Sequence, residues 1–76
     1  MPRNPAHLLR SFLKRRGITQ PSFGRRIGVS GTSVYKYLSG GCIPSEAVRV
    51  AIERETDGAV PAGLWPMTDR RNGTVL

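Results

Sequence analysis

Apolar residues recur at helical spacing near the start of the chain. They fall at positions i, i+1, i+4 and i+5 and so form one stripe, made of Leu8, Leu9, Phe12 and Leu13. Asn4 followed by Pro5 suits the cap and first residue of a helix, because proline at that position loses no helical hydrogen bond. Gly17 then supplies a stop. The pattern predicts a helix over residues 5–16.

A shorter helix is predicted directly afterwards. Thr19 is a suitable cap, and Phe23 and Ile27 are inward residues four positions apart. Between them lies Gly24, although glycine costs about 1 kcal/mol relative to alanine inside a helix. We therefore expect the next helix to approach closely at this point. Gly28 suits the left-handed residue that ends the helix and reverses the chain.

A third helix is predicted over about residues 31–39, with Ser30 as its cap and Gly40 at its end. Its inward stripe, at i, i+3 and i+4, consists of Val34, Tyr37 and Leu38. The other positions face outward and begin with a small, polar turn: Gly31, Thr32, Ser33, Tyr35 and Lys36. Two short helices joined by a glycine turn have the layout of a DNA-binding helix-turn-helix, here over about residues 20–39.

Ser45 and Glu46 favour the start of a fourth helix, as a cap and a first-turn acid. Its expected apolar stripe consists of Ala47, Val48, Ala51 and Ile52. Gly58 is expected to end this helix.

The segment from Val60 to Trp65 predicts an extended link and one helical turn that cover the open end of the core. We therefore expect an all-α fold. It would be a compact four- to five-helix domain over residues 1–66, followed by a short, irregular and flexible tail over residues 67–76.

Charge is distributed unevenly along the chain. The net charge is +7, and eight Lys and Arg residues precede residue 46 with no Asp or Glu among them, whereas four cations and five acids follow. A positive field confined to one half of the chain is expected of a protein that binds nucleic acid. The alternative is a basic surface that only keeps a small protein soluble.

Several function classes find no support in the residue types. No apolar run approaches the ~20 residues needed to cross a membrane, so we expect a cytoplasmic protein without a membrane partner. One cysteine, Cys42, and one histidine, His7, supply neither an internal disulfide nor a zinc-ligand set, and no metal or other cofactor is expected. The chain contains no catalytic triad pattern and no phosphate-binding glycine motif, so an enzyme is not expected.

The spacing within residues 20–37 resembles the helix-turn-helix signature of the lambda-repressor and Cro class of regulators. The resemblance rests on Gln20, Gly24, Gly28, Val29, Ser30, Val34 and Tyr37. Tyr37 departs mildly, because an aliphatic residue is more usual there. Residues 41–60 are similar to the next segment of the Cro and YdaS-like regulators of phages and prophages, where a helix ends in an Ile-Glu-Arg-x-Thr-x-Gly run, as at Ile52 to Gly58 here. The resemblance covers about residues 8–66.

This resemblance implies a bacterial or phage-encoded, lambda-repressor-like regulator that acts at the nucleoid. It would bind double-stranded DNA as a homodimer, on half-sites roughly 34 Å apart, and repress by occluding a promoter. The candidates for base reading in the major groove are Gly31, Thr32, Ser33, Tyr35 and Lys36. The candidates for phosphate contacts are Gln20, Ser30, Arg25, Arg26, Lys14, Arg15 and Arg16. The resemblance supports Gln20, whereas only charge supports the arginines; Lys14 to Arg16 serve equally well as cations that complement a helix end.

Two other functions stay open. An antitoxin-like or adaptor module would keep the same fold and bind a protein partner through the segment from Val60 to Trp65. An RNA-binding protein is a further alternative, but the chain lacks an aromatic stacking platform, because both tyrosines lie on one helix with core roles.

Overall fold

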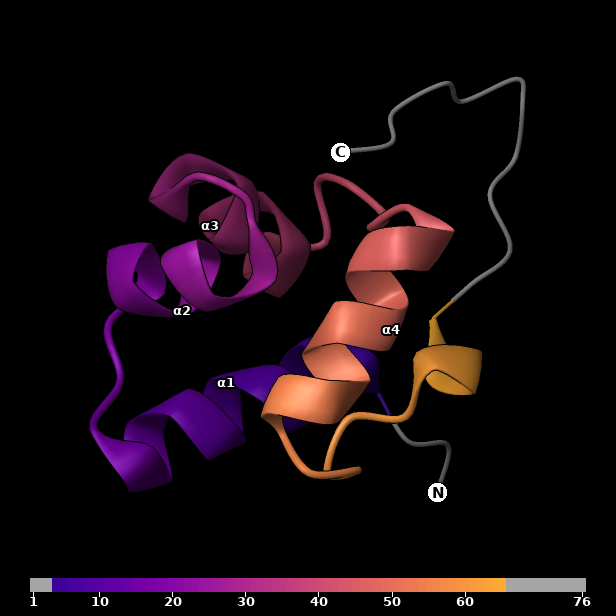
Figure 1. The fold of residues 1–76 in the computed structure, drawn as a ribbon, viewed down its shortest axis with the longest axis horizontal. Coiled ribbons are helices and arrows are strands. Elements are labelled where there is room, and N and C mark those ends of the chain that lie inside the picture. Colours follow the sequence, from indigo (N-terminus) through magenta and orange to yellow (C-terminus); the bar gives the residue numbers. More distant parts are fainter. Residues whose placement is uncertain (1–3, 66–76) are drawn as a thin grey trace.

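Four α-helices and one short 3-10 helix make up the chain in the computed structural model, which describes residues 4–65 (Figure 1). The elements are α1 (Pro5–Arg16), α2 (Gln20–Ile27), α3 (Gly31–Ser39), α4 (Glu46–Glu55) and η1 (Ala62–Leu64). No β-strand occurs within residues 4–65. The all-helical class and the number of helices agree with the prediction. The predicted flexible tail, residues 67–76, lies outside the described residues.

Each α-helix begins at a side-chain cap that the sequence predicted. Asn4 Oδ1 accepts the backbone N–H of Ala6 at 2.9 Å and that of His7 at 3.3 Å. Three hydroxyls accept the N–H three residues further on at 3.3, 3.1 and 3.4 Å, and they belong to Thr19, Ser30 and Ser45. A cap of this kind contributes typically ~1 kcal/mol. The start of each helix is therefore determined by its neighbours in the sequence.

Residues 28–30 form the tight turn between α2 and α3. Gly28 has a φ of 80°, the left-handed value that the sequence predicted. A Cβ added to Gly24 would lie 2.5 Å from the carbonyl oxygen of Val29 and 3.0 Å from the carbonyl carbon of Ser30. A close approach at Gly24 is therefore present, but it is not made by the helix that the sequence predicted. The neighbouring backbone belongs to the turn rather than to α3 itself.

The core collects the inward stripes of all four α-helices. Its fully buried members from these helices are Leu9, Phe23, Val34, Tyr37 and Ile52. The segment after α4 closes one end of this core, as predicted: Val60 is fully buried and Trp65 is 6% exposed. The Trp65 ring meets the Tyr37 ring edge-on, with centroids 6.4 Å apart. η1 lies beside α4 (Figure 1), which holds this segment in place.

α4 presents to the core three of the four residues that the sequence predicted. Ile52 is buried and Val48 and Ala51 are half-buried, whereas Ala47 is exposed and Val50 is 40% exposed. At 3.6 residues per turn, Ala47 lies about 100° around the helix from Val48. That rotation takes Ala47 out of a stripe centred on Val48 and Ile52, so its predicted place in the stripe is wrong.

The end of α4 depends on a buried threonine. The helix stops at Glu55, before the predicted stop at Gly58, which has a φ of 83° in the following turn. The Thr56 hydroxyl donates to the carbonyl of Ile52 at 2.8 Å and accepts the N–H of Val60 at 3.1 Å. Because both bonds are buried, they satisfy polar groups that water does not reach. Thr56 therefore ties the C-terminal segment to α4.

Candidate functional site

The third helix has one buried side and one exposed side. Among the predicted base-reading residues, Thr32, Tyr35 and Lys36 are exposed, and we call the surface that they form the α3 outer face. Gly31 and Ser33 are half-buried in the first turn of the same helix. The opposite side of α3 carries the buried residues Val34, Tyr37 and Leu38. Packing of that inner side against the other helices fixes which residues of α3 meet solvent.

Two serine hydroxyls at the start of α3 are paired with each other. Ser30 Oγ accepts the backbone N–H of Ser33 at 3.1 Å, and the Oγ atoms of Ser30 and Ser33 lie 3.2 Å apart. A hydroxyl has one donor and two acceptor positions, so each serine retains some capacity for a further hydrogen bond. The pairing also fixes the rotamers of both side chains.

Gly31 packs against the beginning of α2. A Cβ at this position would lie 3.0 Å from the Cα of Pro21 and 3.1 Å from its Cγ, which is closer than an ordinary van der Waals contact. Glycine at residue 31 therefore lets the first turns of α2 and α3 approach each other. This contact has no local signal in the sequence, because the two residues are ten positions apart and belong to different helices.

The start of α2 adjoins the α3 outer face. A shallow hollow of about 400 Å³ separates the two, lined by Gln20, Pro21, Gly31, Thr32 and Tyr35. Gln20, a predicted phosphate contact, thus lies beside three of the predicted base-reading residues.

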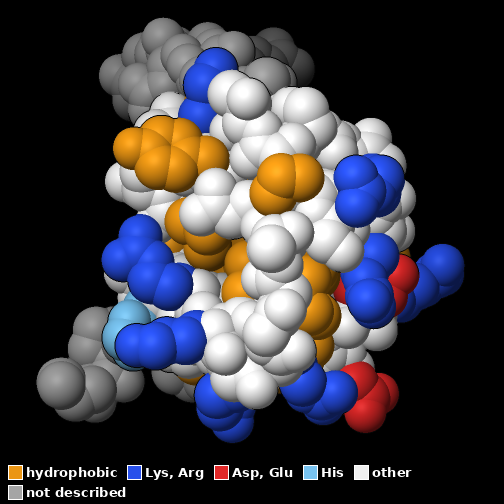
Figure 2. All heavy atoms as spheres, turned by 90° about the vertical axis from the view of Figure 1, so that its left-hand side faces the viewer, with side chains coloured by type: hydrophobic (Ala, Val, Ile, Leu, Met, Phe, Trp, Pro, Cys, Tyr) orange, Lys and Arg blue, Asp and Glu red, His pale blue; other side chains and the backbone are white. Residues whose placement is uncertain are grey.

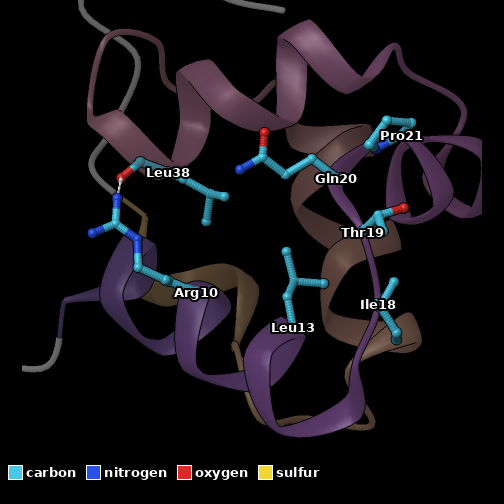
Figure 3. A pocket seen from close by; sticks show the side chains of 7 residues that line it. All are labelled: Arg10, Leu13, Ile18, Thr19, Gln20, Pro21 and Leu38. Carbon is cyan, nitrogen blue, oxygen red and sulfur yellow. Dashed lines mark hydrogen bonds between the residues drawn. The ribbon is translucent and has the colours of Figure 1, made fainter.

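A second hollow, of about 430 Å³, lies where α1, α2 and α3 meet (Figure 3). We call it the junction hollow, and its lining consists of Arg10, Leu13, Ile18, Thr19, Gln20, Pro21 and Leu38. Gln20 and Pro21 line both hollows, so the two hollows adjoin at the start of α2. Figure 3 shows the Gln20 side chain extending from α2 towards Leu38.

Arg10 is a site residue that the sequence did not single out. Its Nη2 donates to the backbone carbonyl of Leu38 at 3.1 Å (Figure 3), and the two residues are 28 positions apart. The sequence places Arg10 only off the apolar stripe of α1. The distance along the chain between the partners explains why no local pattern revealed the bond.

Cations surround much of this side of the molecule. Figure 2 shows Lys and Arg side chains around a central area of uncharged and hydrophobic surface, with acidic side chains only at one edge. The predicted phosphate contacts Arg25 and Arg26 are exposed in the last turn of α2, and Lys14 is exposed in the last turn of α1. The acids of the described chain all lie in α4 or the turn after it: Glu46, Glu53, Glu55 and Asp57.

Two of the predicted phosphate contacts, Arg15 and Arg16, lie away from the two hollows that Gln20 lines. Arg15 and Arg16 border a hollow whose other members, apart from Phe12, belong to the turn at residues 56–59 after α4. That turn includes Asp57, and the guanidinium carbon of Arg16 lies 5.1 Å from the centre of the Phe12 ring. A cation over an aromatic ring is attracted to the ring face. The structure therefore gives Arg16 a packing role and does not bring Arg15 or Arg16 into either hollow beside Gln20.

One tyrosine in this region has an altered acidity. Burial raises the pKa of the Tyr37 hydroxyl, and the neighbouring Cys42 adds to the increase. Tyr37 therefore stays neutral at physiological pH. Within residues 4–65, no group of three or more His, Cys, Asp or Glu side chains is placed to bind a metal ion.

None of the helices within residues 4–65 is long and apolar enough to span a membrane. Comparison of the chain with protein-family models, with curated proteins and with solved structures gave no match.

Proposed function

We propose that the chain is a sequence-specific DNA-binding regulator of transcription. In this proposal α2, the turn at residues 28–30 and α3 are a helix-turn-helix of the lambda-repressor type, and α3 enters the major groove. The observation that supports it best is the surface of α3. An exposed, acid-free outer face begins with a small first turn and lies directly beside Gln20. A helix that enters a groove about 12 Å wide needs such a slim leading end.

Different residues of α3 would have different roles. Lys36 offers a cationic donor that suits a guanine edge or a phosphate, and Thr32 offers a hydroxyl and a methyl group to base edges. Tyr35 is 58% exposed and so has the area to contact a base or sugar. Gly31 has no side chain that could form a hydrogen bond with a base, and the Ser33 hydroxyl already pairs with that of Ser30. Direct base reading would therefore depend mainly on Thr32, Tyr35 and Lys36, with DNA shape supplying further discrimination.

Phosphate contacts would position this helix without reading sequence. Gln20 is the best placed, because it lines the hollow beside the α3 outer face. Arg25, Arg26 and Lys14 are exposed cations that add long-range attraction. Arg15 and Arg16 receive less support, since they adjoin the turn that carries Asp57.

We further propose that two copies bind a two-fold symmetric operator and repress by blocking a promoter. A dimer of this kind places its reading helices about one helical turn, roughly 34 Å, apart. Sites selected from random duplex DNA should then contain an inverted repeat with that spacing. A single, non-repeated site would contradict the dimer but not the DNA binding.

The test is duplex binding by wild type and by Lys36→Ala, measured by fluorescence anisotropy over a salt series on the selected site. We expect Lys36→Ala to weaken binding by about 1–3 kcal/mol if Lys36 contacts a base. Arg54→Ala is the matched control, because Arg54 is an exposed cation on α4 and the net charge changes equally. If wild type shows no duplex binding even at low salt, the proposal fails.

The two alternatives receive less support from the geometry. A protein-binding module that used the segment from Val60 to Trp65 would need its large side chains at the surface, whereas Val60 and Trp65 are buried in the core and Leu64 is half-buried. An RNA-binding surface would need several exposed rings, yet Tyr37 is buried and leaves Tyr35 as the exposed ring of α3. A stoichiometric protein partner that persists in high salt, without nucleic acid, would favour the first alternative.

A further inference from the structure

Arg10 connects the first helix to the end of the third. Its bond to the Leu38 carbonyl reaches one of the last four carbonyls of α3, which have no partner within the helix. The bond is partly buried, so water competes with it only in part. It is a long-range contact that holds the C-terminal turn of α3 against α1.

That bond uses only part of the donor capacity of Arg10. A guanidinium carries five N–H donors in a rigid, planar fork, and a single N–H occupies the Leu38 carbonyl. Fixing one arm of the fork also fixes the direction of the others. The Arg10 side chain is exposed at the rim of the junction hollow, and the acids of the described chain lie in α4 and its following turn. Its remaining donors are therefore available to an oxygen-rich, negatively charged ligand.

A second donor group faces the same hollow. Gln20 lines the junction hollow together with Arg10, and its side chain extends from α2 towards Leu38 (Figure 3). Its amide can donate two hydrogen bonds. A phosphate group presents oxygens in several directions and can accept from a guanidinium and an amide at once.

We propose that Arg10 and Gln20 hold one phosphate of the DNA backbone in the junction hollow. The inference rests on the proposed function and deepens it by naming the residue pair and the chemical group. Because Gln20 also borders the α3 outer face, this phosphate belongs to a strand whose bases lie in front of α3. Arg10 then contacts the phosphate with one part of its fork and the last turn of α3 with another. In this way the contact with the DNA phosphate also positions α3.

The first test compares salt dependence, on the duplex that wild type selects, for full-length wild type, Arg10→Met and the control Arg54→Met. Loss of one phosphate contact should lower the slope of log K against log salt by about 0.9 for Arg10→Met and leave it unchanged for Arg54→Met. The affinity of Arg10→Met should fall about ten-fold on selected and unrelated duplexes alike, since phosphates carry no sequence information. Equal slopes for wild type and Arg10→Met would overturn the inference, as would equal losses in both variants.

Arg10→Lys keeps the charge and guards against a folding defect in Arg10→Met, which circular dichroism would reveal. We expect Arg10→Lys to keep the wild-type slope and to melt at a lower temperature, because an ammonium group lacks the fork that bonds Leu38 and the phosphate together. A slope reduced as much in Arg10→Lys as in Arg10→Met would show that the positive charge at residue 10 does not bind the phosphate, and it would overturn the inference.

A third measurement also changes the DNA. Single backbone phosphates are replaced by uncharged methylphosphonates, and the position that weakens wild type and no longer affects Arg10→Met marks the phosphate. The loss caused by Gln20→Ala should largely disappear on that modified duplex, because the two residues share one partner. Full additivity of the two losses would overturn the shared phosphate. If wild type binds no duplex at all, the proposed function itself fails, which separates that result from a failure of this inference.

Discussion

Tyr35 and Tyr37 lie two residues apart on the same helix and experience opposite environments. Tyr37 has no exposed surface and meets Trp65 edge-on, whereas Tyr35 is 58% exposed beside the hollow that Gln20 lines. Two positions correspond to about 200° around a helix, so the two side chains project to nearly opposite sides. The inner side of α3 determines how the helix is held, and the outer side is free to determine what it contacts. The residues that hold α3 in the core are therefore distinct from the residues that it presents to solvent.

Truncation of the buried Tyr37 ring should have the largest effect on stability. Tyr37→Ala should cost roughly 3–5 kcal/mol, as for other large buried aromatic residues, and should leave the domain mostly unfolded. Tyr35→Ala should change the free energy of unfolding by no more than about 0.5 kcal/mol, because it touches little that is buried. Urea unfolding followed by circular dichroism measures both. Similar losses for the two variants would contradict the division of α3 into an inner and an outer side.

A smaller effect is expected where the turn backbone approaches α2. Gly24→Ala should destabilise by about 1–3 kcal/mol, because its Cβ would lie 2.5 Å from the Val29 carbonyl oxygen and the turn has to move. The matched control is Gly63→Ala, whose Cβ would have no atom within 4 Å and whose φ is not left-handed. That control should be neutral or slightly stabilising. Thermal melts of both variants decide whether this approach constrains the placement of α3.

The smallest expected effect is a change in the free energy of unfolding at alkaline pH. Because burial raises the pKa of Tyr37 above 10.0, the neutral phenol is favoured in the folded state. The resulting stability is fully present below pH 10.0 and is lost as the pH rises through the folded pKa. Tyr37→Phe should remove this component, and Tyr35→Phe should keep it. Unfolding free energies measured from neutral to alkaline pH test the difference between the two tyrosines directly.

Local signals in the sequence predicted much of this fold. Asn4, Thr19, Ser30 and Ser45 cap their helices through N–H groups two or three residues away, so short-range chemistry was enough to place each start. The prediction was wrong where the exposure of a residue depends on how its helix is rotated against the other helices. Ala47 fits an apolar stripe by spacing, but its exposure depends on how α4 rotates against the other helices.

The candidate site was less accessible to prediction because its key contacts are distant in the chain. Gly31 approaches Pro21 across two helices, and Arg10 reaches Leu38 over 28 positions. Neither pair leaves a periodic trace in the sequence. Charge alone also grouped Arg16 with the other cations, whereas the structure places its guanidinium over the Phe12 ring. The sequence therefore indicated which side of α3 faces outward, but not which residues of the other helices contact α3.

The closure of the core by Trp65 has a practical consequence. This is the only tryptophan of the chain, and it lies edge-on to Tyr37 on the inner side of α3. Its fluorescence reports directly on whether the C-terminal segment is seated, because an indole that moves from a buried site into water shifts its emission to longer wavelength. A ligand on the outer side of α3 does not touch this ring. The molecule thus carries its own optical reporter, with which loss of structure and loss of binding can be told apart in a single titration.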